Sequence, residues 1–434
     1  MFPAPLFLVL LILSSPLCLI FDGPLTYGLI TAAAAVLVAI IGLRTRPGEA
    51  EFLSSLIRPV ALVAVLPALA ILIQLMPLRS IGLANSIWQS AATALSRPVI
   101  GSITVDPGAT LICLARYLSL AGLGFVAAAV AIDRRRARWL LFALTTATAL
   151  TALMLLAVGL GGAAQLDIPD RALLFIAAAT NSAVLGIILA IAAALQTLER
   201  PDAPSQGQDN PVLVLLVFVL CLAALATCSL AVFNYATSEA YFALAFGVAT
   251  FVVALIIHRF QLDVWGYSAI VAIVVVVAIA ALALRLGNRM TDFTLAFAAS
   301  PQSPLIALTR RILAETSWLG TGAGTFAAIL PVYRDINELA AGNVAPTAAA
   351  AVAIEMGKPF LVAAIFGAIA LIIMLLRGAA RRGRDSLYPT AGASCVVATT
   401  ILAFNNQGVF NTSVLVIVAT TIGMAIAQSK SRSL

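Results

Sequence analysis

Charged residues are scarce in this chain, and histidine is almost missing. Only 10% of the 434 residues are Asp, Glu, Lys or Arg, whereas a soluble domain typically has about 25%. Hydrophobic residues make up 62% of the chain, and its mean hydropathy is +1.09. A soluble fold of this length cannot bury so much apolar surface, because accessible surface grows steeply with mass. The composition therefore predicts a membrane protein.

The few metal-ligating residues are scattered. His258 is the single histidine, and the five cysteines all lie inside apolar runs without a His or acidic neighbour. We therefore expect no metal site and no cofactor, and we expect the cysteines to pack as small hydrophobic side chains. The basic residues that give the net charge of +7 occur in short loops, which indicates membrane topology and no nucleic-acid partner.

Apolar runs long enough to cross a bilayer recur along the chain. A spanning helix needs about 20 mostly apolar residues. About twelve candidate spans follow from that length: 6–21, 25–43, 59–76, 109–132, 139–160, 172–195, 211–233, 240–257, 266–284, 347–376, 388–404 and 414–427. The first run lacks a basic start and an Ala-x-Ala site, so we expect a span there and not a removed signal peptide.

The predicted fold is therefore all-α and polytopic, with one large extracytoplasmic loop. We expect spans one to nine within 1–284, the loop within 285–346, and the last three spans with a short tail within 347–434. A cytoplasmic N-terminus puts the basic clusters 134–138 and 377–384 inside, as the positive-inside rule requires, and the C-terminus is then cytoplasmic too.

Several charged residues lie where a membrane protein has no structural need for them. Arg116 falls inside a predicted span, Glu239 begins another, and Glu355 lies within the span 347–376. Charge in lipid is expensive, so such residues are functional candidates. The alternatives are that Arg116 extends to the interface, that Glu239 is solvated, and that Glu355 belongs to a structural ion pair.

The predicted loop adds further arginines and a glycine motif. Arg310, Arg311 and Arg334 lie in the loop. The planar guanidinium binds two phosphate oxygens at once, so these residues and Arg116 would suit a diphosphate at the outer face. Gly320, Gly322 and Gly324 do not form a nucleotide-binding loop, because no strand precedes them and no Lys-Ser/Thr follows. They predict a tight turn with close backbone approach.

The segment Trp318 to Phe326, with the sequence WLGTGAGTF, resembles the "P-hydrophobic-G-x-G-x-G-x-F" segment of the O-antigen ligase and Wzy-type polysaccharide polymerase superfamily. Further similar segments are Arg310 or Arg311 upstream, Tyr333-Arg334 and Glu355-Met356-Gly357 downstream, Asp106-Pro107-Gly108-Ala109-Thr110 with Arg116, and Asn181-Ser182-Ala183. The similarity covers most of the chain.

The resemblance implies a GT-C-like bacterial inner-membrane protein. It would transfer a glycan from a polyprenyl-diphosphate carrier to a sugar hydroxyl on the periplasmic face, without a metal, as a polymerase or a ligase of surface polysaccharide or exopolysaccharide. Its partners would be the lipid-linked glycan, membrane lipid and other polysaccharide-assembly proteins such as a chain-length regulator. The arginines would hold the diphosphate.

The chain departs from the family pattern at two places. Pro346-Thr347 stands where ligases carry a His-Asn pair, and Ser238-Glu239 stands where the family has Ser-Arg. One interpretation is an enzyme that uses Glu355, Glu239 or Asp335 as base or orienting group. The alternatives are a catalytically degenerate homologue that scaffolds a polysaccharide-assembly complex, and a lipid-linked oligosaccharide transporter. Few ionisable residues lie in the central parts of the spans, and the chain has no visible internal repeat, which disfavours the transporter.

Overall fold

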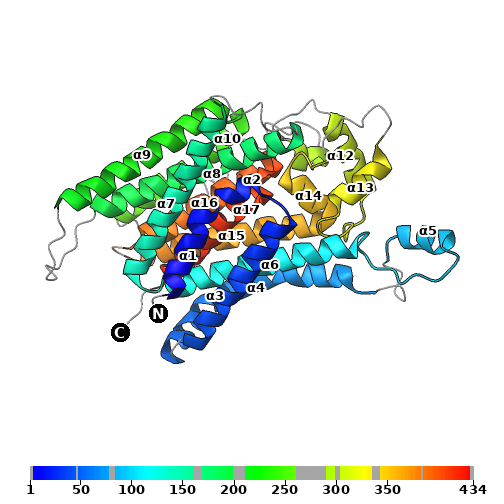
Figure 1. Cartoon of the computed structure of the whole chain (residues 1–434), viewed down its shortest axis with the longest axis horizontal. Coiled ribbons are helices and arrows are strands. Elements are labelled where there is room, and N and C mark those ends of the chain that lie inside the picture. The colour runs from blue at the N-terminus through cyan, green and yellow to red at the C-terminus, as the bar shows by residue number, and fades with distance from the viewer. Residues whose placement is uncertain are drawn as a thin grey trace.

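The chain folds into a bundle of helices (Figure 1). The structure is a computed structural model, and it describes residues 3–44, 47–77, 84–159, 169–198, 211–260, 290–298, 304–334, 343–382 and 385–430. This part of the chain contains helices and no β-strand. The elements are α1 (Pro3–Ser14), α2 (Leu17–Ile20), α3 (Pro24–Arg44), α4 (Pro47–Leu75), α5 (Ile87–Ala94), α6 (Pro107–Val130), α7 (Arg134–Ala157), α8 (Pro169–Leu198), α9 (Pro211–Tyr235), α10 (Ser238–Phe260), η4 (Met290–Leu295), α12 (Pro304–Glu315), α13 (Phe326–Tyr333), α14 (Ala348–Glu355), α15 (Lys358–Arg381), α16 (Leu387–Asn405), η6 (Gln407–Phe410) and α17 (Thr412–Ala427).

Nine helices of the described part are long and apolar enough to cross a membrane, so the protein is a multi-pass all-α membrane protein. They belong to α3, α4, α6, α7, α8, α9, α10, α15 and α16. Two shorter apolar helices, Ala4–Ser14 and Thr412–Ala427, lie in regions where spans were predicted. The predicted span 266–284 falls outside the described residues. The total of about twelve spans stays a prediction.

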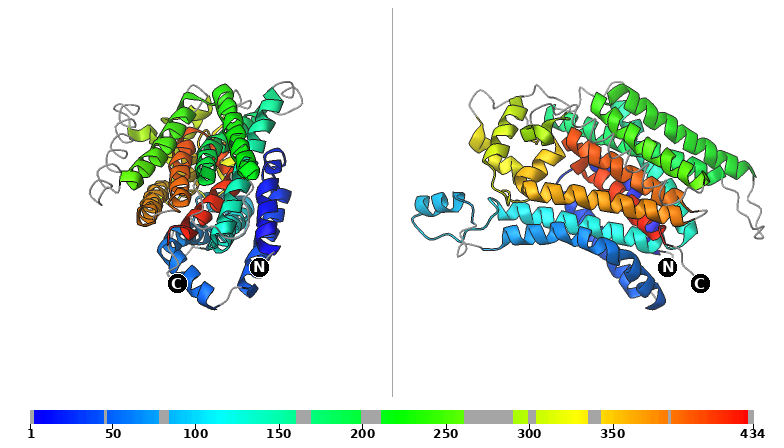
Figure 2. Two further views of the ribbon diagram at one scale, coloured as in Figure 1. Left: turned by 90° about the vertical axis from the view of Figure 1, so that its left-hand side faces the viewer. Right: turned by 180° about the vertical axis from the view of Figure 1, so that it is seen from behind.

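The two ends of the bundle differ in character (Figures 1 and 2). Both chain termini lie at one end, which we call the terminal end, while α5, α12 and α13 lie at the other, which we call the loop end. The terminal end also holds an ion pair between Arg134 and Asp385, whose Nε and Oδ1 atoms are 2.7 Å apart. Arg382 donates to Gln428 beside this pair. Arg134 and Arg382, from the two basic clusters, thus lie at the same end as the described chain ends, and the cytoplasmic orientation of that end stays a prediction.

Small residues let the central helices pack closely. Helix α8 is the most enclosed of the spans and buries Ala178, Ala179 and Ala183 completely. Gly423 on α17 lies directly against the Gly124 carbonyl of α6, where a side chain would overlap the backbone. Lipid-exposed helices gain little from hydrophobicity alone, so close backbone contact between small residues supplies much of their association.

The predicted span 347–376 is two helices, α14 and α15. Gly357 has a φ of 92° and stands at the break between them. Pro359 follows in the first turn of α15, where the missing N–H of a proline does no harm. Glu355 therefore ends a short helix and does not lie inside a membrane-length helix. The third predicted span is likewise part of a longer helix, α4, which continues through Pro59.

The loop end has a small hydrophobic core of its own. Helices α12, α13 and α14 and the short helix η4 pack against one another around Ile312, Phe326, Leu330 and Ile354. Helix α12 is amphipathic, since Ile312 and its apolar neighbours one turn away are buried while Arg310 is exposed. This core carries the glycine motif and Glu355 at its inner edge.

Candidate functional site

The glycine motif forms a tight loop, residues 320 to 324, which we call the glycine loop. Gly320, Gly322 and Gly324 have φ values of 74°, 113° and 78°, in the left-handed region that other residues rarely adopt. A side chain on Gly320 would overlap the Glu355 carbonyl, and one on Gly322 would overlap the Thr104 hydroxyl. The predicted tight turn with close backbone approach is confirmed.

The glycine loop is hydrogen-bonded to the end of α14 and to the non-helical segment before α6. Thr321 N donates to Ile354 O at 3.0 Å, and Gly322 N donates to Glu355 O at 2.9 Å. On the other side, Val105 N donates to Thr321 O at 2.9 Å. Three segments that are far apart in the sequence are therefore fixed together by backbone hydrogen bonds.

The Glu355 carboxylate caps helix α13. Its Oε2 accepts from Gly324 N at 2.8 Å, and its Oε1 accepts from Phe326 N at 3.1 Å. Thr325, the N-cap residue of α13, makes no side-chain cap bond of its own. A carboxylate at a helix N-terminus satisfies N–H groups that have no partner within the helix and interacts well with the helix dipole.

The Glu355 side chain has no ion-pair partner within the described part of the chain. Burial raises the pKa of Glu355 from 4.5 to about 7, while the bonds from Gly324 and Phe326 act in the opposite direction. The predicted alternative of a structural ion pair is thus replaced by a structural cap. A carboxyl with a pKa near neutrality is also suited to proton transfer.

The first turns of α6 lie directly beneath the glycine loop. Asp106 caps α6 by accepting from Ala109 N at 3.1 Å, and Pro107 occupies the first turn. A Cβ on Gly324 would lie 3.2 Å from Ala109 O and 3.5 Å from the Cβ of Cys113. The thiol of Cys113 interacts electrostatically with both Glu355 and Arg116. The motif around Asp106 and the glycine motif therefore form one site.

Arg116 lies deeper along the same helix and contacts the turn between α16 and α17. Its Nη2 donates to Phe410 O and, at 3.0 Å, to Thr412 Oγ1, and its guanidinium lies 4.5 Å from the centre of the Tyr27 ring. Arg116 lies nine positions after Pro107, which places it roughly 13 Å along the helix. Arg116 Nε is buried and has no hydrogen-bond partner among the described residues.

The Asp22 carboxylate is linked to Arg116 through the hydroxyl of Thr412. Asp22 accepts from Thr412 Oγ1 at 2.8 Å and from Asn411 Nδ2 at 3.0 Å. Thr412 therefore accepts from Arg116 and donates to Asp22 through the same oxygen. Non-helical backbone at this depth needs such partners, because lipid supplies no hydrogen bonds.

The predicted Asn181 motif joins the same turn from α8. The Asn181 and Asn406 side-chain amides are 2.9 Å apart and pair with each other. Asn406 O also accepts from Ala348 N at 3.3 Å, which links the turn to the start of α14. Asn181 thus acts as a buried anchor for the polar turn.

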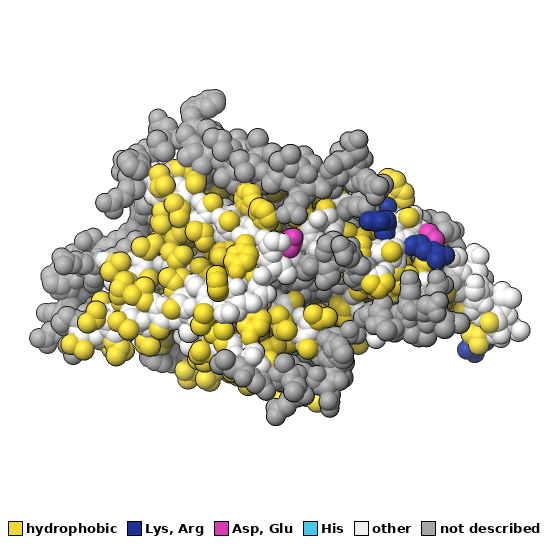
Figure 3. Space-filling view, turned by 90° about the horizontal axis from the view of Figure 1, so that it is seen from above, with side chains coloured by type: hydrophobic (Ala, Val, Ile, Leu, Met, Phe, Trp, Pro, Cys, Tyr) yellow, Lys and Arg dark blue, Asp and Glu magenta, His cyan; other side chains and the backbone are white. Residues whose placement is uncertain are grey.

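The loop arginines lie on the loop-end core. Arg310 and Arg311 are exposed on α12, and Arg311 Nε is 3.7 Å from Glu315 Oε1. Arg334 follows α13, and its Nη1 donates to Asn343 Oδ1 at 2.9 Å. On the face seen in Figure 3, most charged side chains gather toward the end that carries these helices, and hydrophobic side chains dominate elsewhere. The convergence of Arg310, Arg311 and Arg334 with Arg116 on a diphosphate stays a prediction.

The other base candidates lie apart or outside the description. Glu239 is in the first turn of α10 and accepts from Ser238 Oγ at 2.8 Å. Asp335 is outside the described residues. Thr347, at the position of the expected His-Asn pair, caps α14 by accepting from Ala350 N at 3.0 Å. His258 lies 19 residues beyond Glu239 on the same helix, roughly 28 Å away along the axis.

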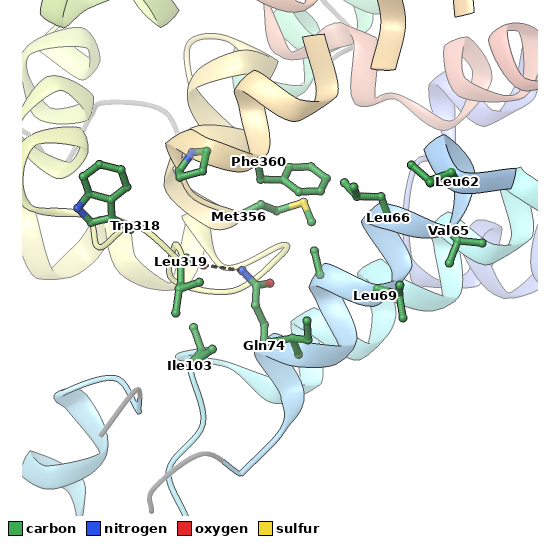
Figure 4. Close-up of a pocket in the computed structure, with 13 residues that line it drawn as sticks. Leu62, Val65, Leu66, Leu69, Gln74, Ile103, Trp318, Leu319, Met356 and Phe360 are labelled. Carbon is green, nitrogen blue, oxygen red and sulfur yellow. Dashed lines mark hydrogen bonds between the residues drawn. The ribbon is translucent and has the colours of Figure 1, made fainter. Parts of the chain in front are cut away.

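An apolar groove opens beside the glycine loop (Figure 4). Its volume is about 590 Å³, and α4 forms one wall while Trp318, Leu319, Met356 and Phe360 form the other. Gln74 is the polar side chain at its inner end, and it hydrogen-bonds to the glycine loop. Gln74 was not among the predicted site residues, although a single amide in the apolar run Ala-Ile-Leu-Ile-Gln-Leu-Met was a visible signal.

No model of a known protein family matches the chain, and no curated protein matches it either. The described residues contain no cluster of three or more His, Cys, Asp or Glu side chains that could hold a metal. The functional interpretation therefore depends on the motifs and on the geometry of the site.

Proposed function

We propose that this protein is a membrane-embedded glycosyltransferase of the polysaccharide polymerase or ligase type. It transfers a glycan from a polyprenyl-diphosphate carrier to a sugar hydroxyl of an acceptor at the loop end, which faces away from the cytoplasm in the bacterial inner membrane. The observation that supports this most is the meeting of three motif segments, around Asp106, Gly322 and Glu355, at one place beside a lipid-open groove.

In the proposed reaction the acceptor oxygen attacks the anomeric carbon of the donor glycan. A new C–O bond forms as the bond to the carrier diphosphate breaks, and the polyprenyl diphosphate leaves. The acceptor proton passes to a base. Glu355 is our candidate, because a carboxylate has about four acceptor positions and, among the described residues, Gly324 and Phe326 occupy two of them. Its raised pKa matches the task.

Positive charge would stabilise the leaving diphosphate. Arg116 contributes a half-buried guanidinium whose Nε is buried and has no hydrogen-bond partner in the described part of the chain. Arg310, Arg311 and Arg334 contribute guanidinium groups on α12 and after α13. Donors aimed at developing negative charge are commonly the largest catalytic contribution in such a site. Glu239 and Asp335 stay alternative bases in this proposal.

A second proposal is that the chain is an inactive homologue that scaffolds a polysaccharide-assembly complex. It is favoured by one observation, namely that Thr347 serves as a helix cap where ligases have their histidine pair. Scaffolding requires the folded surface of the protein but not Glu355 as a base.

Cellular polysaccharide length separates the two proposals. A strain that lacks this protein is complemented with the wild type, with Arg310→Ala combined with Arg311→Ala, and with Glu355→Gln. The enzyme proposal predicts that each variant yields short or missing polymer when its amount in the membrane is matched to that of the wild type. Wild-type polymer length from both variants would favour the scaffold, and Glu315→Gln, on the same helix α12 as the arginines, is the matched control expected to be normal.

A further inference from the structure

The groove beside the glycine loop has a regular helix as one wall and irregular backbone as the other. Leu62, Leu66 and Leu69 line it from α4, and all three are exposed at the outside of the bundle. Its other wall contains Trp318, which is 82% exposed, and Met356 at the break between α14 and α15. The groove is thus open at the outer surface of the bundle, between a membrane-length helix and irregular backbone (Figure 4).

Irregular backbone cannot face hydrocarbon unless its polar groups are bonded. Gln74 supplies the bonds here. Its Nε2 donates to Leu319 O at 2.9 Å and to Glu355 O at 2.8 Å, and its Oε1 accepts from Ala323 N at 3.0 Å. One buried side chain on α4 therefore joins both halves of the candidate site, the glycine loop and the Glu355 backbone.

We propose that the groove binds the isoprenoid chain of the polyprenyl-diphosphate carrier, and that Gln74 transmits its occupancy to the glycine loop and Glu355. The wall is apolar, so it suits a hydrocarbon chain and offers no site for a polar headgroup. The inner end of the groove lies against Leu319 and Met356, next to the proposed reaction site. When the diphosphate of the carrier is at that site, its isoprenoid chain can therefore lie in the groove along α4. The identity of the chain depends on the proposed function, while the role of Gln74 depends only on its contacts.

Trp318 is a built-in reporter for this groove. The full-length protein in nanodiscs is titrated with polyprenyl diphosphate that carries bromine atoms on its isoprenoid chain, and with phosphatidylglycerol brominated on its acyl chains. We expect the carrier to quench the Trp318 component, defined by difference from Trp318→Phe, at a concentration at least about tenfold lower than the phospholipid. Equal quenching by both lipids would overturn the assignment to the carrier.

A matched pair of variants tests the location. Ala70 lines the groove on α4, whereas Ala61 is equally half-buried on the same helix and does not line it. Ala70→Phe should abolish the quenching of Trp318 by the brominated carrier, and Ala61→Phe should leave it unchanged. Unchanged quenching in both variants would place the chain elsewhere.

Hydrogen exchange tests the role of Gln74 as a positioning residue. Binding of the carrier should slow amide exchange in the glycine loop of the wild type at least about threefold. Gln74→Leu should still bind the carrier but show no slowing, and the same slowing in the variant would contradict the proposal. If Gln74→Leu does not fold, Gln74→Glu serves, since it keeps the acceptor for Ala323 and loses both donor bonds. None of these readouts needs turnover, so they are separate from any failure of the glycosyltransferase activity.

Discussion

Glu355 and Gly324 are joined by a hydrogen bond of 2.8 Å from the Gly324 N–H to the Glu355 carboxylate. This bond connects the end of α14 to the loop that starts α13, and Phe326 N adds a second bond to the same carboxylate. A residue whose position suggested an isolated intramembrane charge is thus the cap that holds the candidate site together. Its structural duty and its proposed catalytic duty can be tested separately.

Glu355→Gln should destabilise the protein, because an amide can accept only one of the two backbone N–H bonds and its NH₂ group faces the other donor. The unsatisfied donor should cost roughly 1–3 kcal/mol. Thermal unfolding in detergent measures the effect. Glu315→Gln is the control, since that side chain is exposed and pairs only at the surface; its expected change is within about 0.5 kcal/mol. Equal losses in the two variants would contradict the capping role.

The same variant should show a characteristic pH dependence. Burial raises the folded-state pKa of Glu355 to about 7 from 4.5, so its favourable contribution is fully present below pH 4.5 and is lost as the pH rises to about 7. The stability difference between wild type and Glu355→Gln should therefore be largest at or below pH 4.5 and narrow as the pH rises to about 7. Thermal unfolding of both proteins across this pH range measures the difference. A stability difference that grows as the pH rises would contradict a raised pKa of Glu355.

Gly320→Ala should prevent the glycine loop from closing on Glu355. The residue has a φ of 74°, and an added Cβ would overlap the Glu355 carbonyl. We expect a loss of roughly 2–4 kcal/mol from backbone strain and overlap. Gly28→Ala is the control, because Gly28 is inside helix α3 and nothing lies near its Cβ position. That change should stabilise the protein by roughly 0.5–1 kcal/mol. A well-folded Gly320→Ala protein would contradict the close approach.

Arg116 and Asp22 should be energetically coupled through Thr412, although they form no direct ion pair in the described structure. A double-mutant cycle with Arg116→Leu and Asp22→Asn should give an interaction of roughly 0.5–3 kcal/mol. The exposed pair Arg311 and Glu315 is the reference, with an expected coupling below about 0.5 kcal/mol. Additive effects at Arg116 and Asp22 would mean that Thr412 does not link them.

The sequence predicted the class of fold and several parts of the site for identifiable reasons. Apolar run length predicts membrane-length helices because bilayer thickness sets that length. Glycine at three alternate positions predicted a tight turn with close backbone approach, and Gly320, Gly322 and Gly324 form one with positive φ values. The break at Gly357 was not predicted, although a signal for it was visible: Glu355, Gly357, Lys358 and Pro359 interrupt the apolar residues there, and glycine closely followed by proline is typical of a helix end.

The long-range hydrogen-bond partners of Gln74 and Glu355 could not be predicted from the sequence, for a different reason. Gln74 contacts residues about 250 positions away, and nothing in a single sequence encodes which backbone groups a lone amide will meet. The same holds for Glu355, whose partners among the described residues are backbone N–H groups and not the side-chain cation that its charge suggested. Charge patterns indicate where polar residues are needed, but the folded backbone decides what satisfies them.

The central claim is that the site around Glu355 transfers a lipid-linked glycan. The most direct measurement is reconstitution of the purified protein in liposomes that contain polyprenyl-diphosphate-linked repeat units, with products separated by gel electrophoresis. The account predicts a ladder of polymer, or transfer to an added acceptor, that the wild type makes and Glu355→Gln does not. A folded wild-type protein that leaves its lipid-linked units unchanged, with every acceptor supplied, would contradict it.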